Sequence, residues 1–132
     1  MLTDQQIANV VFNETRSLSG IDIDTARVNV AHAIINGMQL ARPPLAAPST
    51  AKVPDAEKAI YASCVLAVAT ARANLLKETG DPTDGATHFN FRKNNSRGDF
   101  QGHAIKTQIG PLKNSYPSDD LPATGIYANT YV

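Results

Sequence analysis

The chain has 132 residues, with twelve basic and twelve acidic side chains and a formal net charge of zero. This length suits one domain with a core of its own, and the balanced charge excludes a general electrostatic affinity for nucleic acid or for an anionic membrane surface. The single cysteine, Cys64, excludes an intramolecular disulfide, and its place in the apolar run 59–73 favours burial over reactivity.

The N-terminus lacks a basic segment followed by an apolar one, and no apolar run approaches the length of a membrane span. We therefore expect a chain that is made in the cytoplasm without a signal peptide and does not insert into a membrane.

A first helix is predicted over residues 4–17, because Thr3 and Gln6 have the spacing of a capping box. Its apolar stripe consists of Ile7, Val10, Val11 and Leu18. Glu14 falls on the same stripe, so we expect it to point inward, where lost hydration would raise its pKa and suit it to general acid catalysis. A structural role remains open, in which Glu14 lies at the edge of the stripe or pairs with an arginine.

Two further helices and a long loop follow. Asp24 is predicted to cap the second helix, whose inward side chains recur at helical spacing: Ala31, Ile34, Ile35 and Met38, with Arg27 or Val30 behind. Residues 41–54 contain four of the eight prolines and predict a surface loop that could wall a cleft. A third helix is predicted from Pro54 to Gly80, with small side chains that let the first two helices approach closely.

The turn dipeptides Asp81-Pro82 and Asp84-Gly85 introduce an alternating segment, 86–91. One side of this strand carries Thr87, Phe89 and Phe91, and the other carries Ala86, His88 and Asn90. We expect the phenylalanines to face the core and His88 and Asn90 to face water or substrate. A second candidate strand, 101–109, is predicted to end at Gly110-Pro111, and a last short strand covers 126–132.

The sequence carries no pattern typical of a metal site or of a nucleophilic serine or cysteine. His32, His88 and His103 are isolated from one another and from Cys64, without the spacing of zinc ligands. No serine lies in a GxSxG motif. We therefore expect neither a metal nor any other cofactor.

Three blocks together resemble the spore-cortex-lytic type of bacterial cell-wall hydrolase. The first is VVFNETR at 10–16, and the second is VNVAHAIIN at 28–36, like the family's helix of the form VAxVIxNR. The third is DPTDGATHF at 81–89, close to the family's DPTGGATHF. The blocks occur in family order, although Gly37 stands where the family has arginine, and little beyond Ile109-Gly110 matches after Phe91.

The resemblance implies an α+β, lysozyme-like fold, with three main helices followed by a small antiparallel sheet. It also implies cleavage of the peptidoglycan glycan strand between N-acetylmuramic acid and N-acetylglucosamine, with Glu14 as the single catalytic glutamate. His88, Asn90 and Thr87 are the candidate substrate-binding residues. Arg16 lies roughly 200° around the helix from Glu14, which favours a structural anchor.

The sequence offers no convincing second carboxylate, because Asp81 and Asp84 lie in turns that explain them structurally and Asp99 lies in an unplaced loop. This favours a lytic transglycosylase over a hydrolytic muramidase. Because peptidoglycan lies outside the cytoplasmic membrane, we expect delivery by a secretion system or a lysis pore, as for an antibacterial effector or an endolysin. An effector would need an immunity protein that blocks its cleft.

Two other classes of function remain open. The chain could be a catalytically inactive glycan-binding module, since fold alone does not specify chemistry. It could also be a peptidoglycan amidase or peptidase, although the missing metal-ligand and nucleophile patterns argue against that.

Overall fold

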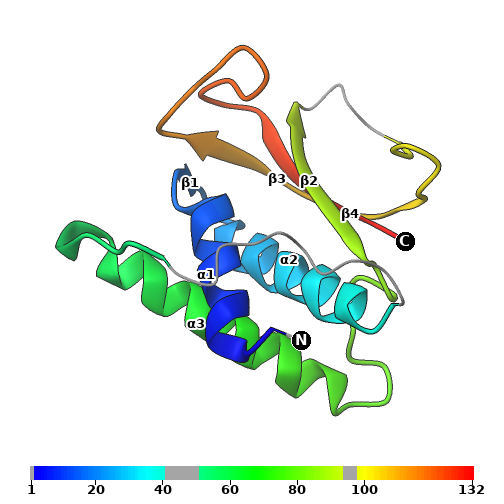
Figure 1. The fold of residues 1–132 in the computed structure, drawn as a ribbon. Helices are drawn as coiled ribbons and strands as arrows, with labels where there is room; N and C mark the ends of the chain where they lie inside the picture. Colours follow the sequence, from blue (N-terminus) through cyan, green and yellow to red (C-terminus); the bar gives the residue numbers. More distant parts are fainter. Residues whose placement is uncertain (1, 41–50, 94–97) are drawn as a thin grey trace.

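The computed structural model describes residues 2–40, 51–93 and 98–132 and has an α+β architecture (Figure 1). The helices are α1 (Asp4–Thr15), α2 (Ile23–Met38) and α3 (Lys58–Leu75), the last preceded by the 3₁₀ turn η1 (Asp55–Glu57). The strands are β1 (Leu18–Ser19), β2 (His88–Lys93), β3 (Ile105–Asn114) and β4 (Ile126–Tyr131). They form an antiparallel sheet in the order β1-β3-β4-β2.

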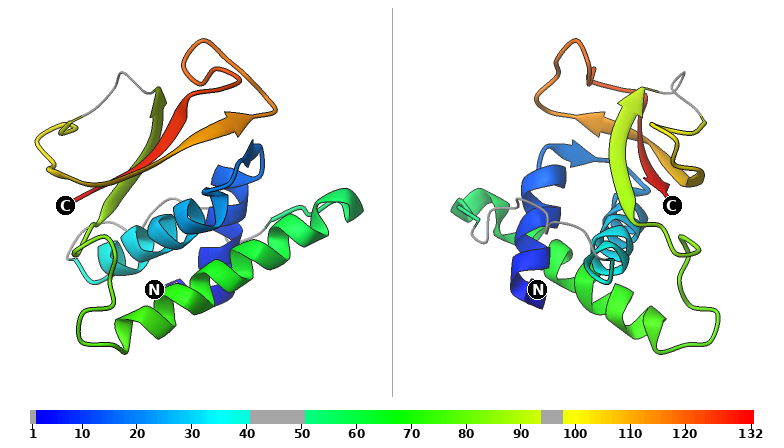
Figure 2. Two further views of the ribbon diagram at one scale, coloured as in Figure 1. Left: turned by 180° about the vertical axis from the view of Figure 1, so that it is seen from behind. Right: turned by 45° about the vertical axis from the view of Figure 1, so that its right-hand side comes forward.

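Helix α2 is the middle layer of the molecule. It contacts α1 and α3 on one side and the three longer strands on the other, as the two views of Figure 2 show. Its buried side chains include five of the six predicted inward residues, and only Met38 is partly exposed. This burial on both sides explains why so many small or β-branched apolar residues occur between Ala26 and Ile35.

Helix α1 begins as predicted and ends two residues earlier. The Thr3 hydroxyl accepts from the Gln6 amide and the Gln6 side chain accepts from the Thr3 amide, so the capping box is confirmed. In α2 the N-cap is Asp22, and Asp24 lies in the first turn, so its assignment as the cap was wrong. In the first turn, the Asp24 carboxylate still interacts favourably with the positive end of the helix dipole.

Helix α3 is shorter than predicted, because Pro54 precedes the 3₁₀ turn and the helix ends at Leu75. Gly80 does not end the helix, although the sequence predicted that it would, and it is required for a steric reason. A Cβ atom at this position would lie 1.8 Å from the carbonyl oxygen of Asn74, so only glycine lets the chain pass back over the helix end. The predicted loop 41–54 lies mostly outside the described residues, and its last four residues form no regular element.

Strand β3 continues through Gly110-Pro111, where the sequence predicted an end. The register against β4 shifts between Ile109 and Leu112, which accommodates a residue that has no N–H to donate. A Cβ at Gly110 would lie 2.7 Å from the Ile126 carbonyl oxygen, so glycine permits this close approach. The last strand, β4, is confirmed and occupies the centre of the sheet.

The buried apolar residues form two clusters. One lies among the three helices, and the other joins Leu18 and Ala26 to the sheet. Phe91 packs against both clusters and Phe89 against the first, so the prediction that these side chains face the core is confirmed. Within the described ranges, no helix combines the length and the hydropathy that crossing a membrane requires.

Candidate functional site

Glu14 lies in the last turn of α1 and is exposed, so the prediction that it points inward was wrong. The centre of the buried arc of α1 lies near Ala8, Val11 and Thr15, and Glu14 is roughly 90° from that centre at 100° per residue. The sequence stripe included Val10 and Leu18 but omitted the side chains that pack towards α3. The true arc is therefore wider and displaced away from Glu14.

Exposure does not leave the Glu14 carboxyl in a fully aqueous environment. Neighbouring protein atoms remove part of its hydration, and this desolvation raises its pKa above the ordinary value of 4.5. Among the described residues, no arginine, lysine or histidine forms an ion pair with it. The result is an accessible carboxyl that holds its proton to a higher pH than a carboxyl in water.

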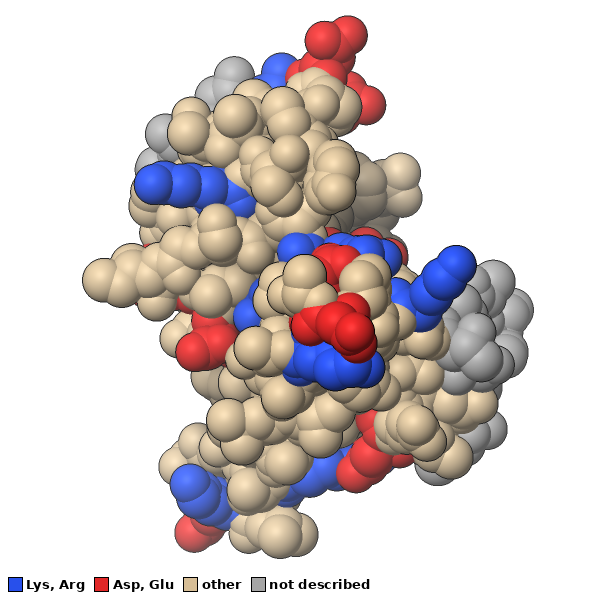
Figure 3. Space-filling model, turned by 90° about the vertical axis from the view of Figure 1, so that its left-hand side faces the viewer, with Lys and Arg blue, Asp and Glu red and all other residues tan. Residues whose placement is uncertain are grey.

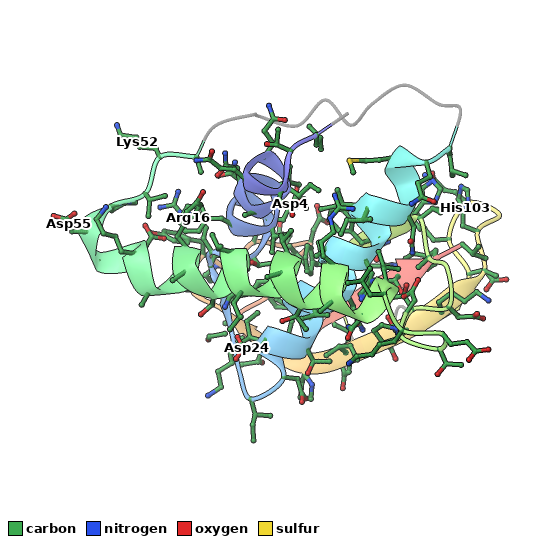
Figure 4. All side chains as sticks on the ribbon, turned by 90° about the horizontal axis from the view of Figure 1, so that it is seen from below. Asp4, Arg16, Asp24, Lys52, Asp55 and His103 are labelled. Atoms are coloured by element: carbon green, nitrogen blue, oxygen red, sulfur yellow. The ribbon has the colours of Figure 1, made fainter. Side chains whose placement is uncertain are left out.

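Arg16 is a structural anchor, as predicted. Its guanidinium donates to both carboxylate oxygens of Glu57, with Nε 2.9 Å from Oε1, and lies 5.0 Å from the centre of the Phe12 ring. The hydrogen bond to Glu57 raises the pKa of Arg16, and nearby Tyr116 adds to this effect. Figure 4 shows Arg16 beside the first part of α3. The Arg16–Glu57 pair therefore fixes the end of α1 against the start of α3. Arg16 does not form an ion pair with Glu14.

A turn from the sheet is attached to the same end of α1. The amide and the hydroxyl of Ser115 donate to the Ser17 carbonyl at 2.9 and 3.1 Å. The buried Asn114 side chain accepts from the Tyr116 amide and donates to the Tyr116 carbonyl, both at 3.0 Å. These bonds hold the backbone of Tyr116, a residue that is 78% exposed. Sequence reasoning missed this residue, because the tail 115–125 has no periodicity that would place it.

The DPTDGATHF block forms a turn organised by Asp81. Its Oδ1 accepts from the amide and the hydroxyl of Thr83 at 2.8 and 2.7 Å. Its Oδ2 accepts from the Gly85 amide at 3.1 Å and from the Asn36 side chain at 2.9 Å. These hydrogen bonds outweigh desolvation and lower the pKa of Asp81. The carboxylate thus has a structural role.

His32 extends this network into the core. The ring is fully buried, with Nε2 3.2 Å from the Asn74 amide nitrogen and Nδ1 3.5 Å from Asp81 Oδ1. Because an amide nitrogen only donates, Nε2 is the accepting nitrogen and the proton lies on Nδ1, facing Asp81. Burial lowers the pKa of His32, and the charge of Asp81 opposes that shift. Residues from α2, α3 and the turn therefore meet at a neutral imidazole.

His88 and His103 are not isolated from each other, which corrects the sequence interpretation. Their ring centres are 3.9 Å apart, and their planes differ by 32°. His88 Nδ1 lies 2.9 Å from the Thr87 hydroxyl, and His103 Nδ1 lies 3.0 Å from the Val132 carbonyl. The sequence held no signal for this contact, because it depends on the fold of the segment that connects β2 to β3.

Asn90 does not face open solvent, so that prediction was wrong. Its Oδ1 accepts from the Tyr131 hydroxyl at 2.9 Å and from the Asn129 amide at 3.3 Å, and both partners are fully buried. Phe100, which precedes β3, packs against the Tyr131 ring. Thr87 joins the sheet edge, where its amide donates to the Tyr131 carbonyl at 2.8 Å.

The structure does not gather the predicted site residues in one place. Arg27, near the start of α2, bonds to Thr15 at the end of α1, whereas Asn36, near the end of α2, bonds to the Ala86 carbonyl at 2.9 Å. These two positions lie about 13 Å apart along the helix axis. Arg16 and His103 accordingly appear at opposite ends of the molecule in Figure 4. Glu14 and the histidine pair therefore occupy different regions.

The other aspartates considered from the sequence have structural partners. Asp84 accepts from Lys106 Nζ at 3.0 Å, and Asp99 accepts from the Ile105 amide at 3.1 Å. In the part of the chain that the structure describes, no three His, Cys, Asp or Glu side chains are grouped to hold a metal ion. On the face shown in Figure 3, basic and acidic side chains are interleaved without a large area of one sign.

Comparisons with known proteins give no match. No family model, no curated protein and no solved structure is detectably similar to this chain.

Proposed function

We propose that this protein cleaves the glycan strand of bacterial peptidoglycan between N-acetylmuramic acid and N-acetylglucosamine, as a lytic transglycosylase of lysozyme-like fold. The observation that carries the proposal is Glu14, an accessible carboxyl with a raised pKa at the end of α1. A group that retains its proton nearer to neutral pH is suited to general acid catalysis. The resemblance of VVFNETR and DPTDGATHF to the cell-wall hydrolase motifs supports this substrate class.

In the proposed reaction, protonated Glu14 donates to the glycosidic oxygen as the bond from that oxygen to the anomeric carbon of muramic acid breaks. The 6-hydroxyl of the same muramic acid then forms a bond to the anomeric carbon, and Glu14 takes up the hydroxyl proton. The carboxyl returns to its starting state, and no water is consumed. One carboxyl therefore suffices, whereas hydrolysis by the usual scheme needs a second.

Two features support this scheme over a two-carboxylate one. The acidic side chains considered as a second carboxyl already accept hydrogen bonds. Asp81 accepts from its own turn, Asp84 accepts from Lys106, and Asp99 accepts from the backbone at the start of β3. Glu57, from η1, is held by Arg16. Asp81, Asp99 and Glu57 have structural functions that a role as nucleophile or base would disturb, whereas the exposed Asp84 only pairs with Lys106.

Tyr116 is the proposed sugar-stacking residue. Its aromatic face is exposed beside the end of α1, and its backbone is fixed by Asn114. An exposed aromatic ring face complements the C–H face of a saccharide. His88, Asn90 and Thr87 become secondary, because they lie towards the opposite end of α2 and could contact only a distant part of a glycan polymer.

The proposed substrate lies outside the cytoplasmic membrane, so the protein would act in the periplasm or cell wall after delivery by a secretion or lysis system. An antibacterial effector of this kind would require an immunity protein that covers Glu14. Fusion to a periplasmic signal peptide should then lyse the producing cell, and co-expression of the immunity protein should prevent lysis. Harmless accumulation of the folded fusion protein in the periplasm would contradict the proposal.

The direct test is the clearing of purified peptidoglycan sacculi by the wild-type chain, by Glu14→Gln and by Glu78→Gln. Glu78 is an exposed glutamate beyond α3 and serves as the matched control. Glu14→Gln should lose about two to four orders of magnitude in rate, the scale of general acid–base catalysis, while its thermal unfolding stays unchanged. Equal rates for the two variants would refute the assignment. Binding to sacculi without cleavage would indicate a glycan-binding module, and release of peptides would indicate an amidase or peptidase.

A further inference from the structure

Helix α3 has an apolar face turned away from the rest of the molecule. The exposed residues on it are Ala59, Ala62, Val65, Leu66, Ala69 and Ala73, and the C-cap residue Leu76 continues it. Leu66 is 66% exposed and Leu76 is 89% exposed. A helix that covers a monomer normally has polar residues on its outer face, so an outer face made of leucine, valine and alanine indicates a missing partner.

The spacing on this face is that of a helix–helix seam. Six positions alternate in steps of three and four residues: Ala59, Ala62, Leu66, Ala69, Ala73 and Leu76. This is the a/d pattern of a coiled coil, here carried by residues that the structure leaves exposed. It extends over about 25 Å of the helix axis at 1.5 Å per residue.

We propose that this seam binds the same seam of a second copy of the chain, with the two α3 helices antiparallel. In that arrangement Leu76 faces Ala59 of the second copy, and Leu66 faces Ala69 of the second copy. Each leucine therefore inserts opposite an alanine, and the remaining pair joins Ala62 and Ala73. A parallel arrangement would instead place leucine against leucine and alanine against alanine, which packs unevenly.

The charged side chains at the edge of the seam do not prevent the antiparallel arrangement. Lys58 lies 3.7 Å from Asp55, and Arg72 lies 2.9 Å from Asp4. The antiparallel pairing brings Lys58 next to the Arg72–Asp4 pair of the second copy. Lys58 and Arg72 of the second copy are both basic, and the Asp55 and Asp4 carboxylates of their own chains offset this like-charge contact.

A shallow groove extends the contact surface beyond the seam. Side chains of α1 and α3, including Ala8, Tyr61, Val65 and Ala69, enclose about 310 Å³ beside the middle of the seam. The two-fold axis would pass close to Val65, so the groove of one copy receives apolar atoms of the other. One pair of helices of this length still buries less than the roughly 800 Å² per partner of a standard interface. The dimer is therefore weak, with a dissociation constant in the micromolar range or above.

Sedimentation velocity on the full chain, from about 1 µM to 1 mM, tests the association. The wild type should shift from monomer to dimer over this range. Leu66→Glu should raise the dissociation constant by about a hundredfold or more, because it buries two unpaired carboxylates. The matched control is Ile21→Glu, which adds a charge at a 97% exposed isoleucine outside α3 and should leave the dimer unchanged. A wild type that stays monomeric throughout, or a dimer insensitive to Leu66→Glu, would overturn the proposal.

Cysteine cross-linking tests the orientation. The double variant Ala62→Cys/Ala73→Cys should form disulfide-linked dimers on mild oxidation, whereas either single variant should not. The native Cys64 is fully buried and does not compete. Efficient cross-linking of the single Ala62→Cys variant would indicate a parallel pair and contradict the antiparallel seam. The result is independent of Glu14, because the seam lies on the outer face of α3.

Discussion

Replacing Asp81 by alanine removes the acceptor that organises the DPTDGATHF turn. Four hydrogen bonds are lost, two of them from Thr83, which is fully buried. A buried donor left without a partner costs about 1–3 kcal/mol, and solvent entry at the partly exposed Asp81 site relieves some of this cost. We therefore expect Asp81→Ala to lower the free energy of unfolding by about 2–4 kcal/mol.

For a chain of this size the loss corresponds to a fall in Tm of about 7–14 °C. Thermal unfolding followed by circular dichroism and urea unfolding measure it. Asp84→Ala is the control, since the Asp84 side chain is 89% exposed in its pair with Lys106 and should contribute under about 0.5 kcal/mol. Equal, small effects for both variants would show that the Asp81 network does not hold the turn, and the reasoning would fail.

Four further predictions concern pH and metals. The free energy of unfolding should fall as the pH drops below 6.5, because His32 becomes protonated in the unfolded chain while its lowered pKa keeps it neutral in the folded state. In a series of urea unfolding curves at different pH, His32→Asn should flatten this part of the pH dependence. The stability that ionised Asp81 contributes is fully present above 3.8, its pKa in the unfolded chain, and should disappear as the pH falls through its lowered pKa in the folded state. A further drop in Tm in this pH range that the Asp81→Ala variant lacks would confirm the contribution. Cleavage of sacculi should decline as the pH rises through the raised pKa of Glu14, since the acid must be protonated, and a rate that instead increases there would contradict the assignment. EDTA should leave the cleavage rate unchanged, whereas complete loss with recovery on adding zinc would refute a metal-free mechanism.

Local sequence signals predicted the elements whose structure depends on near neighbours. The Thr3–Gln6 capping box and the alternation that turns Phe89 and Phe91 to the core are both present. The position of Arg16 around α1 correctly separated it from Glu14 and favoured an anchor. In each case the deciding contact lies within a few residues or follows directly from helical or strand periodicity.

The errors arose where a distant segment decides the environment. Burial of Glu14 depends on which side of α1 packs on α3, and the environment of Asn90 depends on Tyr131, which donates to it from a later strand. The contact between His88 and His103 depends in the same way on how the chain folds between β2 and β3. Periodicity identifies which side chains share a face, but it does not reveal what covers that face.

The most direct test of the central claim is the mass of the muropeptides that the wild-type chain releases from purified peptidoglycan. The single-carboxyl mechanism at Glu14 predicts 1,6-anhydro-muramyl ends, which weigh one water less than hydrolytic products, resist borohydride reduction and are absent from the Glu14→Gln digest. Reducible muramic ends throughout the wild-type digest would contradict it and require a second carboxylate.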